Sequence, residues 1–190
     1  MKSQITDKAV EMSKLFNKII NSKKSMSAKF SSIISMIAKQ LNVDAAVCYL
    51  VIDDNYIELF ASHNINPKLI NHISIKVGEG IIGGIAQSKL TTEVENIWQH
   101  PNFLYREGVD EEKYKSFLGT PILRWGRSIG VLGLYQEDLY NFKKEEVHAL
   151  EMLAMEFSDW LASDEIREYK NAFIKKKGYK RIILIGYSFG

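Results

Sequence analysis

The stretch that decides the fold runs from His100 to Gln136 and reads HPNFLYREGVDEEKYKSFLGTPILRWGRSIGVLGLYQ. Its second half predicts two strands, Ser116 to Arg124 and Ser128 to Gln136, joined by Trp125-Gly126-Arg127. A glycine at a tight reversal is the usual hairpin signal, because glycine tolerates a positive φ. The first half is polar and aromatic and has no apolar period, so we expect a loop. Binding domains often place their ligand-facing residues in such long loops.

Upstream of this stretch, the apolar pattern changes its period along the chain. From Ala45 to Ile52 both alternating faces are apolar, which predicts a central strand that is covered on both sides. Tyr56 to Ser62 returns as the second strand of a hairpin, and Ile73 to Val77 alternates as a third strand. A short helix is expected from Ile81 to Ser88, followed by a weaker extended segment from Thr91 to Ile97.

Helical periodicity lies at both ends of the chain. Apolar residues spaced by three and four predict one helix over Thr6 to Ile20 and a second from Phe30 to Leu41, with Ser25 or Ser27 as its N-cap. A long C-terminal helix carries an apolar stripe from Val147 to Leu161. This order of elements predicts an α+β fold, in which N- and C-terminal helices flank an antiparallel sheet of about six strands.

Composition limits the classes of protein that fit. The chain has 190 residues, of which 46% are hydrophobic, and 25 basic residues nearly balance 23 acidic ones. It can bury a core, and it offers no general reason to expect nucleic acid or membrane as the partner. We interpret the basic run from Lys170 to Arg181 as a solvated connector. The absence of an apolar run of ~18 residues and of a secretory signal predicts a cytoplasmic protein.

Catalytic and metal-binding patterns are weak. A single cysteine, Cys48, excludes an intramolecular disulfide and multi-thiolate zinc, and its apolar strand predicts burial rather than reactivity. The four histidines are scattered without metal-binding spacing. Gly186 to Gly190 reads GYSFG and matches a nucleophile elbow in letters, but an elbow needs a following helix, an acid and a histidine. We therefore predict no catalytic residues, no metal site and no cofactor.

Three segments carry a resemblance to a known family. GIIGGIAQSK, ENIWQHPNF and EEKYKSFLGTPILRWGRSIGVLGL resemble a GAF domain. More narrowly, they resemble the N-terminal GAF domain of the nitrogen-related enzyme I, a phosphoenolpyruvate–protein phosphotransferase. The resemblance implies an N-terminal amphipathic helix over residues 1–22, a GAF domain over 23–165, and a helical linker with the truncated start of another domain over 166–190. It implies a regulatory fragment of the nitrogen phosphotransferase system, not an enzyme.

The loop from Glu95 to Gly119 is the predicted pocket wall, because it mixes aromatic and polar side chains. Acidic side chains there would accept from a ligand ammonium group, while Arg124, Arg106 or the amides that open the helix at Ile81 would bind a carboxylate. The resemblance implies that the ligand is an amino acid such as glutamine. The predicted ligand-binding residues are Asn96, His100, Phe103, Glu111, Glu112, Tyr114, Ser116 and Arg124.

Two other interpretations stay open. Each of these side chains could instead close the sheet or face solvent. The module as a whole could be a ligand-free scaffold that forms a homodimer through its terminal helices. Met152 and Met155 lie off the main apolar stripe of the last helix, and surplus apolar surface of this kind often marks a subunit interface.

Overall fold

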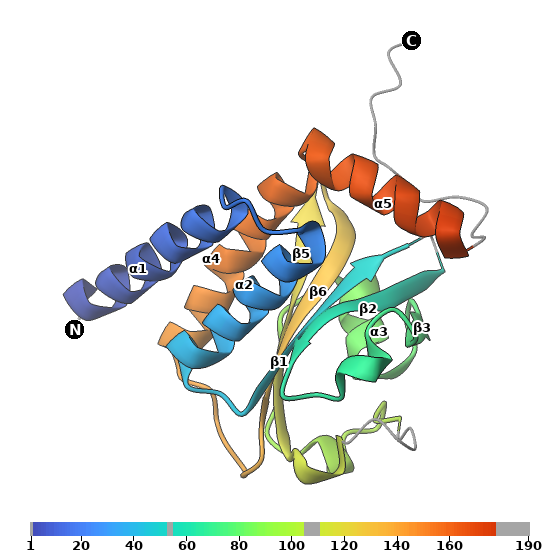
Figure 1. Ribbon diagram of the computed structural model, residues 1–190. Helices are drawn as coiled ribbons and strands as arrows, with labels where there is room; N and C mark the ends of the chain where they lie inside the picture. The colour runs from blue at the N-terminus through green and yellow to red at the C-terminus, as the bar shows by residue number, and fades with distance from the viewer. Residues whose placement is uncertain (1, 53–54, 105–110, 178–190) are drawn as a thin grey trace.

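The computed structural model describes residues 2–52, 55–104 and 111–177. Figure 1 shows helices packed on both faces of one twisted sheet, as the α+β prediction requires. The helices are α1 (Lys2–Ile20), α2 (Met26–Leu41), α3 (Gly80–Ser88), α4 (Lys144–Leu161) and α5 (Asp164–Lys177). The strands are β1 (Ala45–Val51), β2 (Tyr56–His63), β3 (Ser74–Lys76), β4 (Thr92–Val94), β5 (Ser116–Arg124) and β6 (Arg127–Gln136).

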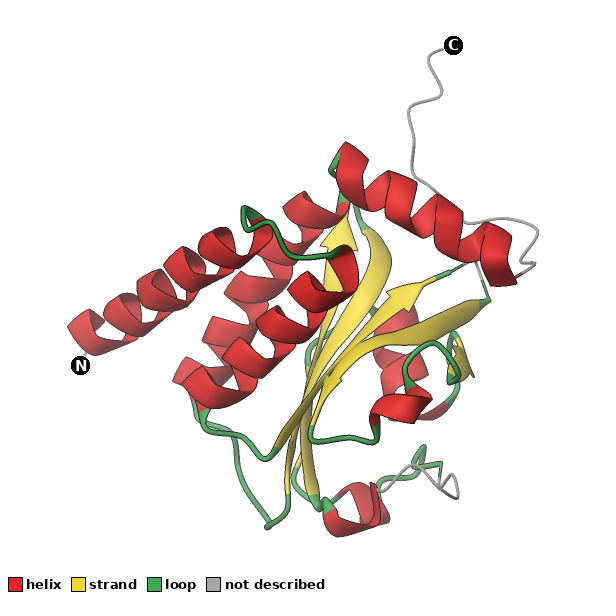
Figure 2. Cartoon of the chain, viewed as in Figure 1, coloured by secondary structure: helices red, strands yellow, loops and turns green. Residues whose placement is uncertain are grey.

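The sheet has six antiparallel strands in the order β3-β2-β1-β6-β5-β4, which confirms the predicted fold class. Both faces of β1 are buried: Ala46, Cys48 and Leu50 face one hydrophobic cluster, while Val47 and Tyr49 face the other. Helices α2 and α4 cover the first face with α1 packed on both, and α3 covers the second (Figures 1 and 2). A central strand with two apolar faces therefore separates two cores.

Aromatic side chains hold α1 in place over the first core. Phe16 of α1 is 2% exposed and lies edge-on to Phe157, with ring centroids 5.3 Å apart. Phe30 of α2 packs against Trp160 of α4 at 4.8 Å. Pairs with this tilted or edge-on geometry contribute about 0.5–1.5 kcal/mol each beyond the area they bury. The N-terminal helix is therefore part of the core and not an appendage.

The hairpin between β5 and β6 is tighter than the sequence predicts. Two residues, Trp125 and Gly126, form the turn with φ of 47° and 74°, and β6 begins at Arg127 instead of Ser128. A two-residue turn with both central φ angles positive matches the right-handed twist of the flanking strands. That match is why the reversal takes one residue fewer than expected.

The C-terminal region corrects one interpretation of the sequence. Helix α4 ends at Leu161, and α5 starts at Asp164 and folds back across the sheet (Figure 1). The Ser163 carbonyl accepts from Arg167 N at 3.0 Å, and Asp164 and Glu165 occupy the first turn, where acidic groups suit the helix dipole. Lys170, expected in a solvated run, is only 6% exposed. The segment interpreted as the start of another domain, residues 181–190, lies outside the described residues.

Candidate ligand pocket

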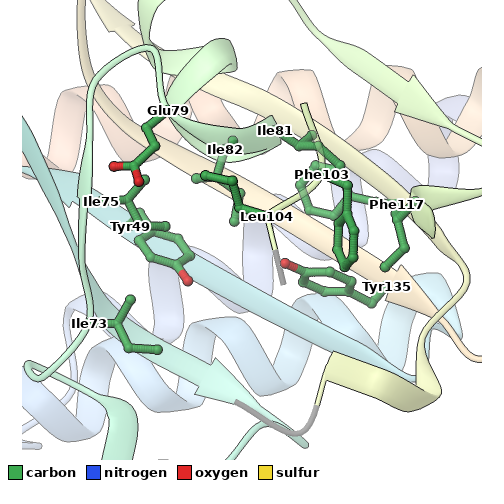
Figure 3. A pocket seen from close by; sticks show the side chains of 12 residues that line it. Tyr49, Ile73, Ile75, Glu79, Ile81, Ile82, Phe103, Leu104, Phe117 and Tyr135 are labelled. Atoms are coloured by element: carbon green, nitrogen blue, oxygen red, sulfur yellow. The ribbon is translucent and has the colours of Figure 1, made fainter. Parts of the chain in front are cut away.

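A pocket lies between the sheet, α3 and residues 97–104, on the face that α3 covers (Figure 3). The centres of water-sized molecules can occupy about 50 Å³ of it, while all of its empty space, open solvent included, is about 550 Å³. It therefore has room for a few water molecules, since each needs roughly 10–15 Å³ of such space. The lining residues are Tyr49, Ile73, Ile75, Glu79, Gly80, Ile81, Ile82, Ile97, Phe103, Leu104, Phe117 and Tyr135.

Three aromatic residues from three strands form the floor of the pocket. Tyr49 lies on β1, Phe117 on β5 and Tyr135 on β6, and each is less than 5% exposed. The Phe117 and Tyr135 ring centroids lie 4.8 Å apart. A Cβ at either of the paired residues Gly119 and Gly133 would come within 2.7 Å of the Phe117 ring. Glycine in both strands therefore lets this ring lie flat against the sheet.

The N-terminus of α3 forms one rim. The first amide groups of a helix have no acceptor within the helix and carry partial positive charge. Here they belong to Gly80, Ile81 and Ile82, all of which line the pocket. Glu79, the N-cap residue, is the only carboxylate among the lining residues, and its Oε2 accepts from Lys76 N at 3.1 Å. One acidic group and a set of amide donors therefore lie side by side.

Figure 3 shows how the polar atoms lie in this pocket. The Tyr135 hydroxyl points toward the middle of the group of labelled side chains, and the Glu79 carboxylate lies beside Ile75. Tyr49 also carries a hydroxyl group, and the other labelled side chains are apolar. An apolar cavity with a few convergent polar groups is the usual composition of a small-molecule site.

Residues 97–104 form the opposite rim. Trp98 stacks on Phe103 with centroids 4.9 Å apart, and its Nε1 donates to the Tyr114 carbonyl at 3.0 Å. Leu104 is 43% exposed at the mouth of the pocket. Arg106, a candidate for binding a ligand carboxylate, lies outside the described residues.

Two of the predicted site residues brace this rim from within the loop. Asn96 Oδ1 accepts from Trp98 N at 3.1 Å, and His100 Nδ1 accepts from Asn102 N at 3.2 Å. Neither lines the pocket, whereas Phe103 does. Ligand contact by Asn96 and His100 stays a prediction, and their positions are those of supports for Phe103.

Tyr114 and Ser116 are fully buried, and their hydroxyls bond to the chain itself. Tyr114 donates to the Asn64 carbonyl at 2.7 Å, and burial raises the pKa of its phenol. The Ser116 hydroxyl bonds to the carbonyls of Glu95 and Asp138 at 2.6 and 3.0 Å and accepts from the backbone N of Tyr140 at 2.7 Å. These bonds tie three loops to the start of β5.

The remaining predicted residues lie elsewhere. Arg124 is at the hairpin end, where its guanidinium lies 3.1 Å from Asp159 of α4 and stacks over Trp125 at 4.7 Å. Glu112 is exposed, and the side chain of Glu111 lies outside the described residues. Of the seven predicted residues whose side chains the structure describes, one, Phe103, lines this pocket.

Sequence reasoning missed Tyr49, Glu79 and Tyr135 as pocket residues. A signal existed for two of them. Alternation along Ala45 to Ile52 places Tyr49 on the face opposite Cys48, and Glu79 directly precedes a predicted helix. Tyr135 gave no local signal, because only the pairing of β1 with β6, in which Tyr135 lies opposite Ala45, brings it to the pocket that Tyr49 also lines.

With this geometry in hand, comparison with known proteins assigns the chain to a family. The model of the GAF domain matches residues 25–158, so the chain belongs to the GAF domain family. Among the described residues, no three His, Cys, Asp or Glu side chains gather in a way that could hold a metal ion. No helix in the described part of the chain is both long and apolar enough to cross a bilayer.

Individual curated proteins share part of their sequence with this chain. The chain is 31% identical over 119 residues to a Nif-specific regulatory protein of Azospirillum lipoferum, covering 61% of this chain and 19% of that protein. It is 26% identical over 129 residues to a phosphoenolpyruvate-dependent phosphotransferase system protein of Escherichia coli K12, covering 66% and 17%. The chain thus matches under a quarter of the length of its curated relatives.

A solved structure agrees with the second relative. The GAF domain of an Acinetobacter phosphoenolpyruvate-protein phosphotransferase superposes with a TM-score of 0.73 at 27% identity, covering 85% of this chain and 95% of that one. The resemblance to phosphotransferase GAF domains that the sequence motifs predict is confirmed. The similarity to Nif-specific regulators was not expected from the sequence.

Proposed function

We propose that this GAF domain is a regulatory sensor for a free amino acid. The observation that carries the proposal is the pairing of the Glu79 carboxylate with the opening amides of α3 in one largely apolar pocket. A free amino acid has a cationic ammonium group and an anionic carboxylate on the same carbon. The pocket offers the Glu79 carboxylate to the ammonium group and the first amides of α3 to the carboxylate.

The polar groups define one way for the ligand to bind. Its ammonium group donates to Glu79, and its carboxylate accepts from the amides of Ile81 and Ile82. Its side chain extends over Phe117 and places a terminal amide beside the tyrosine hydroxyls of the floor. Glutamine has such an amide, and it is the ligand that the family resemblance implies. Because the pocket has room for only a few water molecules, binding displaces Phe103 and Leu104 outward toward the mouth.

Sensing requires that the ligand bind one conformation more tightly than another, because only this difference shifts an equilibrium. The two named relatives are a regulatory protein and a phosphotransferase system component. We propose that this module regulates a phosphoenolpyruvate–protein phosphotransferase in the cytoplasm.

Isothermal titration calorimetry tests the ligand. Glutamine should bind, whereas glutaramate, which lacks the α-ammonium group, and glutamine amide, which lacks the carboxylate, should bind at least tenfold more weakly. Glu79→Gln should weaken glutamine binding by about 1.5–3 kcal/mol, which is the contribution of a charged hydrogen bond. Glu145→Gln is the matched control, because Glu145 also lies in the first turn of a helix, α4, and does not line the pocket.

Two results would contradict the proposal. The first is the absence of heat and of any thermal shift with all twenty amino acids. The second is tight binding of glutaramate, which would mean that Glu79 does not select the ammonium group.

A second candidate, a ligand-free dimerisation scaffold, is favoured by one observation. Met155 on α4 is 71% exposed and Val10 on α1 is 44% exposed. Apolar side chains on two helices of the same layer are surface that a second copy would cover.

A further inference from the structure

Helix α5 docks on the face of the sheet opposite the pocket. Ile166, Lys170 and Ile174 point inward at helical spacing and are 0%, 6% and 8% exposed. Tyr169 and Phe173 pack against the same core. This helix follows the matched GAF region, which ends at residue 158, so it is the described link to any sequence that follows.

An irregularity in the sheet places the α5 contact directly behind the pocket floor. In the pairing of β1 with β2, Cys48 lies opposite Ala61 and Tyr49 lies opposite Leu59, so Phe60 is an extra residue. Such a bulge re-aims a side chain. The Phe60 ring meets Phe173 of α5, with centroids 4.8 Å apart. Tyr49, which lines the pocket, lies next to this irregularity in the pairing of β1 with β2.

The docking of α5 includes a buried cation. None of the hydrogen bonds or ion pairs among the described residues includes Lys170. Burial lowers the pKa of Lys170 to about 8, and Cys48 of β1 is the ionisable group that interacts with it electrostatically. The other charged groups on this face are Lys29 of α2, which is paired with Glu165 at 2.8 Å, and Glu58 of β2. Because burial penalises its charge, this cation weakens the docking.

The joint between α4 and α5 is only two residues long. It consists of Ala162, which has φ −86° and ψ −6°, and Ser163. Ala162 N and Ser163 N donate to the carbonyls of Asp159 and Trp160, at 3.2 and 3.0 Å. These bonds end α4, while the Ser163 carbonyl accepts from Arg167 N in the first turn of α5. Beyond this first turn, the described contacts of α5 with the core are made by side chains.

We propose that α5, residues 164–177, is a reversible latch on the back of the pocket floor, and that pocket occupancy and α5 docking favour each other. The bulge at Phe60 is the link, because it contacts α5 on one face of the sheet and adjoins Tyr49 on the other. The coupling to the ligand rests on the proposed sensor function, whereas the latch itself does not.

The single cysteine reports on the latch. Cys48 is fully buried on the face that α5 covers, so its reaction with a thiol reagent such as 5,5′-dithiobis(2-nitrobenzoate) requires opening. At pH 7.5, Phe173→Ala should raise the labelling rate at least tenfold. Lys170→Met should lower the labelling rate at least tenfold. The reason is that the proton affinity of Lys170 differs by a factor of roughly 300 between the docked and free states of α5.

A control variant separates local opening from global unfolding. Met12→Ala weakens the packing of α1, away from α5. It therefore shows how the labelling rate changes when only the overall stability changes. Urea unfolding of each variant supplies that stability. The labelling rate of each variant is then plotted against its free energy of unfolding. If Phe173→Ala and Lys170→Met fall on the line through the wild type and Met12→Ala, then α5 does not open separately and the latch is wrong.

Glutamine tests the coupling. At saturating glutamine the wild-type labelling rate should fall at least threefold, because a filled pocket supports the floor strand behind α5. An unchanged rate despite calorimetric binding would overturn the coupling while leaving the sensor function intact. If glutamine does not bind at all, the sensor function and the coupling both fail, and the labelling rates of the variants still decide the latch.

Discussion

At the scale of single residues, Lys170 shows how burial sets a pH dependence. Its folded-state pKa of about 8 lies below the ordinary 10.5, so charging this side chain opposes folding. The difference corresponds to about 3 kcal/mol, at 1.36 kcal/mol per pH unit. Above pH 8 the folded lysine loses its proton while the unfolded lysine keeps it. The free energy of unfolding therefore rises with pH, up to about 10.5.

Cys48 acts in the opposite direction and must be removed from the measurement. Burial raises the pKa of its thiol from 9.0 to about 12, so the unfolded thiol ionises first and stability falls above pH 9. In a Cys48→Ala background, we predict that urea unfolding free energies increase between pH 8 and 10. Adding Lys170→Met should abolish that increase and raise stability at pH 7.5. Equal slopes with and without Lys170 would show that this lysine is not buried in solution.

At the scale of elements, the position of α3 sets the shape of the pocket. A Cβ on Gly83 would lie 2.3 Å from the Lys76 carbonyl, so only glycine lets the helix approach the end of β3. Gly83 O also accepts from Gly78 N at 2.8 Å, which fixes the turn that leads into the helix. The rim formed by Glu79 and the first amides of α3 depends on this close approach.

Two neighbouring glycines provide a matched test of this contact. Gly83→Ala should reduce the unfolding free energy by about 1–3 kcal/mol, the usual cost of overpacking. Gly84→Ala should be neutral or stabilise the protein by up to about 1 kcal/mol, because nothing lies within 4 Å of its Cβ position and alanine favours the helix. Equal effects in chemical denaturation would mean that α3 does not pack closely on β3.

At the scale of the whole molecule, the exposed methionine on α4 bears on assembly. If the terminal helices form a homodimer, Met155→Lys should shift the mass measured by light scattering toward that of one chain. Leu139→Lys is the control, because Leu139 is also exposed, at 57%, and lies in the loop between β6 and α4. A wild-type protein that is monomeric at every concentration measured would remove the scaffold alternative.

Much of the fold could be predicted because burial leaves a local pattern. Two apolar faces along Ala45 to Ile52 predict a central strand, and β1 has this role. The glycine in Trp125-Gly126 predicts the hairpin, and Ser25 is the observed N-cap of α2. The candidate site was harder to predict. Loop composition pointed to Phe103, whereas the carboxylate in the pocket is Glu79, from the turn before α3.

The amino-acid sequence by itself therefore determined which residues form strands and helices and which faces are buried, since periodicity and turn chemistry act over a few residues. Only the tertiary structure decided that Tyr49 and Tyr135 share a pocket floor and that α5 folds back onto the sheet and buries its own Lys170. The physical reason is that these contacts depend on strand register and helix packing between segments far apart in the chain. An apolar face specifies that it will be covered, but it does not specify which segment covers it.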